Sequence, residues 1–130
     1  MATYALIHGP GDSGAHWDLL GPELRARGHE VIAIDLPCEN ESAGLVEYAD
    51  TAVAAIGARA PVTVVAQSFG AFTAPLLWDR VPVELIVLIA GMVPLPGERG
   101  EEWSGQHVLP RAGGRGRGQG RDLLQRRPPR

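Results

Sequence analysis

The sequence contains no lysine and only one cysteine, Cys38. A single cysteine cannot form a disulfide within the chain, which agrees with a reducing compartment. No apolar run approaches the roughly 20 residues of a membrane-spanning helix. The N-terminus also lacks the basic region and the long apolar stretch of a secretory signal. The sequence therefore predicts a cytoplasmic protein that has no membrane partner.

Charge is divided unevenly along the chain, although the formal net charge is only −3. Residues 1–102 hold five arginines and 14 acidic residues, whereas residues 103–130 hold seven arginines and one aspartate. The first part therefore offers no basic face to a nucleic acid. In the second part, 16 of 28 residues are arginine, glycine or proline and no period is visible. We expect a disordered basic tail, and the lack of interleaved aromatic residues argues against nucleic-acid binding.

Apolar patterning in residues 1–102 alternates between strands and helices, as expected of one domain. Predicted strands cover residues 4–7, 31–34, 62–67 and 83–89. Helical spacing predicts helices at residues 15–27, 45–56 and 69–78, the last kinked or shortened by Pro75. The strand Val31–Ile34 is apolar at every position, which predicts burial on both faces. This order predicts an α/β fold: a parallel sheet with helices on both faces.

Polar residues stand where three of these strands end: His8, Asp35 and Ser68. Ligands of parallel α/β sheets bind at this edge. Ser68 lies in Ala66-Gln67-Ser68-Phe69-Gly70, between a strand and a helix, and small residues surround it as in a nucleophile elbow. The pattern indicates a nucleophilic serine. The alternative is a serine that only caps the following helix.

From about Thr3 to about Glu102, the chain resembles the N-terminal portion of α/β-hydrolases, in particular the esterase and hydroxynitrile-lyase-like branch. The motifs that carry the resemblance are the segment from His8-Gly9-Pro10-Gly11 to Trp17, then Asp35-Leu36-Pro37, the elbow Ala66–Gly70, and Ala90-Gly91-Met92-Val93-Pro94. The resemblance implies hydrolysis of a small-molecule carboxylic ester without a metal or cofactor. It also implies that Ser68 attacks the carbonyl carbon and that the N–H of Phe69 binds the oxyanion.

The resemblance further implies that the loop at Gly9 and Gly11 supplies the second oxyanion donor. The residue that usually donates after His-Gly is Pro10 here, and proline has no N–H. Gly11 is then the candidate donor. We interpret His8 as a residue that orders this loop by hydrogen bonding, with action as a base as the alternative.

A second pattern overlaps the same loop. Gly9, Gly11 and Gly14 spell Gly-x-Gly-x-x-Gly after a strand, and Asp35 follows about 20 residues later. A Rossmann-type NAD(P)-dependent oxidoreductase is therefore the alternative enzyme. The serine elbow favours the hydrolase, because a dehydrogenase has no need for an exposed serine. A non-catalytic interaction module with a basic tail is the alternative from another class.

The catalytic acid and histidine that should follow Ser68 are not identified in the sequence. His107 is the only later histidine, and Asp122 comes after it instead of before it. Candidate acids that precede it are Glu98, Glu101 and Glu102. Nothing in the pattern places these three at a strand end.

We therefore expect a hydrolase domain that is truncated or frame-shifted after about residue 102, with residues 103–130 as a separate tail. Such a chain would lose most of its catalytic rate with its histidine. Its sheet would end at the strand 83–89 and leave apolar surface uncovered. That surface predicts self-association through the incomplete sheet.

Overall fold

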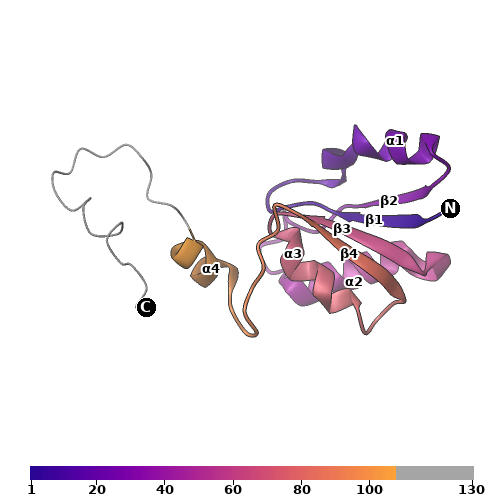
Figure 1. The fold of residues 1–130 in the computed structure, drawn as a ribbon. Helices are drawn as coiled ribbons and strands as arrows, with labels where there is room; N and C mark the ends of the chain where they lie inside the picture. Colours follow the sequence, from indigo (N-terminus) through magenta and orange to yellow (C-terminus); the bar gives the residue numbers. More distant parts are fainter. Residues whose placement is uncertain (108–130) are drawn as a thin grey trace, which may run out of the picture.

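Residues 1–107 are described by the computed structural model, so the predicted tail lies outside the described residues from residue 108 onward. Four strands form one sheet: β1 (Thr3–Ile7), β2 (Glu30–Ile34), β3 (Val62–Gln67) and β4 (Val83–Ile89). Their order across the sheet is β2-β1-β3-β4, and every neighbouring pair is parallel (Figure 1). The predicted parallel α/β sheet is confirmed.

Helices and 3-10 turns connect the strands in the expected alternation. They are η1 (Gly14–Trp17), α1 (Leu20–Ala26), α2 (Leu45–Ile56), η2 (Gly57–Arg59), α3 (Gly70–Thr73), η3 (Ala74–Leu77) and α4 (Gly100–His107). Pro75 lies in the first turn of η3, so the predicted interruption appears as a short α-helix that continues as a 3-10 helix. None of the helices described in residues 1–107 is long and apolar enough to cross a bilayer.

Helices cover both faces of the sheet, as predicted (Figure 1). On one face, α2 and η3 pack against the larger core, where Ile7, Ile34, Ile56 and Leu77 are fully buried or nearly so. On the other face, a smaller core joins β1, β2 and β3 to Trp17 and to α1. The loops that follow the strands are thereby held at one edge of a packed sheet.

The two outer strands differ in how far they are covered. In β2 only Ala33 is exposed, so the prediction of burial at all four positions is wrong there: β2 is an edge strand, and its outer side lacks a neighbour among the described strands. In β4 the exposed fraction reaches 54% for Leu85 and 42% for Ile89. The predicted apolar surface at the last strand is therefore present in the described residues.

The segment after β4 extends away from the sheet and ends in α4 (Figure 1). Its path is held by a hydrogen bond of 3.0 Å from Trp103 Nε1 to the carbonyl of Val93. The sequence showed no helical period here, and α4 crosses residue 102, where we expected the hydrolase-like segment to end. Glu102 explains part of the helix start, because its carboxylate accepts the Arg99 N–H at 2.9 Å.

Candidate active site

Ser68 occupies the sharp turn between β3 and α3. Its φ of 53° is in the left-handed region, which residues with a Cβ adopt at a cost of about 1 to 2 kcal/mol. Backbone hydrogen bonds hold the turn: the Ser68 N–H donates to Ile89 (3.0 Å), and the Ser68 carbonyl accepts from Ala71 (3.2 Å) and Met92 (3.1 Å). The elbow is therefore fixed by the end of β4 as well as by its own helix.

Glycines let the neighbouring loop approach this turn. A Cβ on Gly70 would lie 3.0 Å from the carbonyl oxygens of both Ile7 and His8, so any side chain there would strike the end of β1. A Cβ on Gly9 would lie 3.4 Å from Ser68 Cβ and 2.8 Å from the side chain of Gln67. The structure thus places the loop after β1 directly beside Ser68.

His8 is fully buried and joins two loops. Its Nε2 accepts the Leu36 N–H at 3.0 Å, which requires an unprotonated Nε2. Its Nδ1, 2.7 Å from the Gly9 carbonyl, then carries the proton and donates it. Both ring nitrogens are therefore occupied by backbone groups, and the ordering role of His8 stays a prediction.

Asp35 supports the same loop from the end of β2. Its Oδ1 accepts the Gly14 N–H at 3.2 Å, and the Oδ1 lies 4.0 Å from His8 Nε2. The glycines of the Gly-x-Gly-x-x-Gly pattern lead into the short helix η1, and the carboxylate of Asp35 closes that loop. The glycine-rich segment and Asp35 thus form one loop structure beside Ser68.

Asp12 and His16 lie at the exposed rim of this loop. Their side chains form an ion pair of 2.8 Å between Oδ2 and Nδ1. The pKa of Asp12 is held below its ordinary value of 3.8, first by the Ser13 N–H that donates to Oδ1 and also by His16, while desolvation opposes the shift. The loop is therefore held by the hydrogen bond to Asp35 and by the contact between Asp12 and His16 at its exposed rim.

The hydroxyl of Ser68 points to Met92, with 3.9 Å between Oγ and Sδ. A thioether is a weak acceptor and does not take up the proton. Among the described side chains, which end at residue 105, no imidazole or carboxylate is hydrogen-bonded to this hydroxyl. Among the candidate acids, Glu98 accepts the Leu95 N–H at 2.8 Å and Glu102 caps α4.

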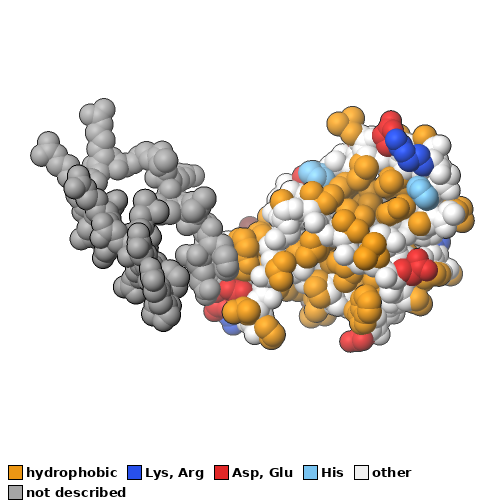
Figure 2. Space-filling model, in the orientation of Figure 1, with side chains coloured by type: hydrophobic (Ala, Val, Ile, Leu, Met, Phe, Trp, Pro, Cys, Tyr) orange, Lys and Arg blue, Asp and Glu red, His pale blue; other side chains and the backbone are white. Residues whose placement is uncertain are grey.

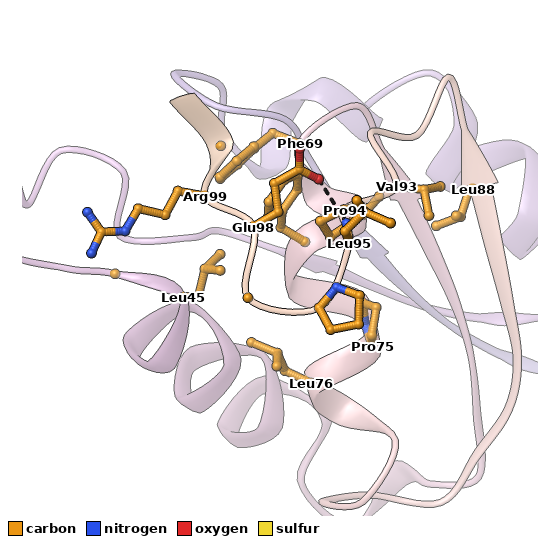
Figure 3. A pocket seen from close by; sticks show the side chains of 16 residues that line it. Leu45, Phe69, Pro75, Leu76, Leu88, Val93, Pro94, Leu95, Glu98 and Arg99 are labelled. Carbon is orange, nitrogen blue, oxygen red and sulfur yellow. Dashed lines mark hydrogen bonds between the residues drawn. The ribbon is translucent and has the colours of Figure 1, made fainter. Parts of the chain in front are cut away.

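Two hollows flank Phe69. The larger, about 860 Å³, lies between α3, the start of α2 and the segment 93–100, and most of its lining is apolar (Figure 3). In Figure 3 the Glu98 carboxylate is bonded to the Leu95 backbone, and the Arg99 side chain points away from the hollow. The smaller, about 760 Å³, is lined by Pro10, Phe69, Met92 and the first turn of α4. The smaller hollow thus reaches the loop after β1 and the partner of the Ser68 hydroxyl.

The structure brings His8, Gly9, Ser68 and Phe69 to one edge of the sheet, and Gly11 lies in the loop beside them. It also reveals two contributors that sequence reasoning missed, Leu36 as the partner of His8 and Met92 beside Ser68. Both contacts depend on strand order, and no local pattern signals them. The side chain of His107 and the whole of Asp122 lie outside the described residues.

Comparison with known proteins shows the family of this chain. A family model described as "Alpha/beta hydrolase family" matches residues 5–130. Norfluorocurarine synthase 1 from a Strychnos species is 31% identical over 103 residues, which cover 70% of this chain and 39% of that protein. The sequence of the same-named enzyme from Strychnos nux-vomica is 30% identical over the same length. The chain thus spans about two fifths of the length of these curated relatives.

Solved structures agree on the fold. An extracellular α/β-hydrolase from a Paenibacillus species, described as sharing structural and functional homology with tobacco salicylic acid binding protein 2, superposes with a TM-score of 0.67 at 24% identity. That match covers 73% of this chain and 43% of the other. Polyneuridine aldehyde esterase gives a TM-score of 0.66 at 22% identity over 82% of this chain and 48% of its own. The family match decides between the hydrolase and the dinucleotide-binding alternative: this chain belongs to the α/β-hydrolase family.

Proposed function

We propose that this chain is a carboxylic ester hydrolase in which Ser68 is the nucleophile. The observation that carries the proposal is the left-handed φ of 53° at Ser68, on a turn between a buried strand and a helix. Such strain is kept at functional sites when the surrounding structure fixes it, and a helix cap alone does not require it. The serine stands at the edge of the sheet where the elbow of α/β-hydrolases presents its hydroxyl.

In this mechanism the N–H of Phe69 binds the oxyanion that forms when Ser68 attacks the ester carbonyl. Within the described residues, the N–H groups of Phe69 and Gly11 donate to no other group, so both are free for a ligand. Pro10 has no N–H, which leaves Gly11 as the second donor. His8 and Gly9 act by holding the loop in place, through the buried ring and the close approach to Ser68.

The base is not among the described side chains, which end at residue 105. There Met92 is the hydrogen-bond partner of Ser68 Oγ, and a thioether is not the proton acceptor that makes serine a strong nucleophile. Enzymes that lose a triad member keep a residual acceleration of roughly 10³ to 10⁴ over water from the oxyanion hole and binding. We therefore expect slow turnover of a small-molecule ester by this chain. The cytoplasmic location also stays a prediction.

A fluorophosphonate probe forms a bond to a nucleophilic serine oxygen, so slow labelling over a long incubation tests the proposal. Labelling should occur on the folded protein, be lost in Ser68→Ala, and persist in Ser42→Ala, where an exposed loop serine is removed as the matched control. Circular dichroism of each variant establishes that the protein is folded. The proposal fails if the folded chain does not react, or if Ser68→Ala labels as well as the parent protein.

A further inference from the structure

Met92 lies against Ser68 through both its backbone and its side chain. The Met92 N–H donates to the Ser68 carbonyl at 3.1 Å, and the Met92 Sδ accepts the Ser68 hydroxyl at 3.9 Å. The Ser68 N–H donates to Ile89, the last residue of β4, three positions before Met92. Three contacts between Ser68 and residues 89–92 therefore hold the sulfur beside the hydroxyl oxygen.

Met92 also lines a hollow that small molecules can enter. It is partly buried and borders the smaller hollow, about 760 Å³, together with Pro10, Phe69 and the first turn of α4. Figure 2 shows many hydrophobic side chains at the surface, and the large exposed ones among the described residues are aliphatic apart from Met1 and Trp78. Aliphatic side chains do not react with peroxides, whereas a thioether does. Met92 is thus an oxidisable group in contact with Ser68.

We propose that Met92 is a site of reversible oxidation by peroxides, and that its sulfoxide lowers the reactivity of Ser68. In this step the thioether sulfur attacks one oxygen of hydrogen peroxide, the O–O bond breaks and an S–O bond forms. The sulfur loses two electrons. The hydroxide that leaves takes up the proton of the transferred oxygen and becomes water. Methionine sulfoxide reductases return the sulfoxide to the thioether.

Oxidation changes the hydrogen bond that Ser68 makes. The thioether is a weak acceptor, so the hydroxyl turns away from it at little cost. The sulfoxide oxygen is polar and accepts strongly, but it is not basic enough to take the proton that the hydroxyl must lose. It therefore holds the hydroxyl without activating it. Breaking such a bond before the attack would slow the reaction roughly three- to tenfold, and this effect rests on the proposed role of Ser68 as the nucleophile.

The chain holds two other sulfur atoms that serve as references. Met1 is 96% exposed and precedes β1, at the opposite end of the parallel strands from Ser68. Cys38 is a free thiol, which peroxides also oxidise. Oxidation of Met1 or Cys38 leaves the partner of the Ser68 hydroxyl unchanged. The effect on Ser68 should therefore follow the oxidation of Met92 alone.

Treatment of the full chain with hydrogen peroxide, followed by fluorophosphonate labelling, tests the proposal. Peptide mass spectrometry should show one added oxygen on Met92, and labelling of Ser68 should slow roughly three- to tenfold. Methionine sulfoxide reductase should remove the oxygen and restore the rate without any substitution. The matched control is Met92→Leu, a replacement of similar volume, whose own labelling rate should be equal before and after peroxide. Circular dichroism before and after treatment establishes that the chain stays folded.

Four results would each overturn the proposal: no oxygen on Met92 under conditions that oxidise Met1, an unchanged labelling rate once Met92 is oxidised, no recovery with the reductase, or equal slowing of Met92→Leu by peroxide. A folded, untreated chain that does not label would instead overturn the proposed function, and the effect on Ser68 with it. The mass of the Met92 peptide would then still decide whether Met92 is oxidised.

Discussion

The two outer strands of the sheet have similar apolar sequences and opposite surroundings. In β2, Val31, Ile32 and Ile34 are at most 8% exposed, because α1 packs on one face and α2 on the other. In β4, four of seven side chains are large, apolar and at least 36% exposed, and η3 covers one face only. An apolar run therefore indicates a strand that can be buried on both faces. Whether both faces are buried depends on which helices pack against the strand.

The largest expected effect is a loss of stability in the covered strand, β2. Ile34 is 1% exposed, so Ile34→Ala should lower the free energy of unfolding by about 2 to 4 kcal/mol through lost burial and the cavity left behind. Ile89 is 42% exposed, so Ile89→Ala should cost less than about 1.5 kcal/mol. Urea unfolding of both variants at one low protein concentration measures the difference. Equal losses would mean that β4 is covered in solution.

A smaller change in stability is expected when a glycine is replaced at the packed elbow, compared with a glycine in the exposed helix α4. In Gly70→Ala the new Cβ would lie 3.0 Å from two carbonyl oxygens of the β1 end, so a loss of about 1 to 3 kcal/mol is expected. In α4, Gly105→Ala meets nothing within 4 Å and improves helix propensity, so it should be neutral or stabilising by up to about 1 kcal/mol. Thermal unfolding checks both signs. Matching losses would contradict the packing at the elbow.

The smallest effect concerns the loop rim beside β2. Because the folded pKa of Asp12 lies below its ordinary value, its carboxylate adds stability at pH values above the unfolded pKa, and that stability disappears as pH falls through the folded pKa. Asp12→Asn should therefore lower the melting temperature slightly at pH 6 and leave it unchanged near pH 2. Ser42→Ala, in an exposed loop away from this pair, provides the control. A difference that persists at pH 2 would assign the effect to something other than the charge.

Strand positions, the helix at 45–56, the break at Pro75 and the uncovered last strand could all be predicted from the sequence. The strands and the helix follow from local periodicity, and the break follows from the missing N–H of proline. The uncovered strand follows because no strand pattern was found after residues 83–89. The contacts of His8 with Leu36 and of Ser68 with Met92 could not be predicted from the sequence. They join loops that only the strand order β2-β1-β3-β4 brings together. The helix α4 was missed since its apolar content is low and its start depends on carboxylate caps.

The irregular pairing of β3 with β4 determines which way the last strand faces. The register shifts by one residue between Val62 and Thr63, so Val83 and Ile86 both pack against the larger core although three positions separate them. In a regular strand, residues three apart point to opposite faces. The bulge thus resets the phase of the alternation at Glu84. Without Glu84, Val83 and Ile86 would be two positions apart and would still share the core face of a regular strand. A regular register that kept Glu84 would instead turn Ile86 out of the core and bring Leu85 into it.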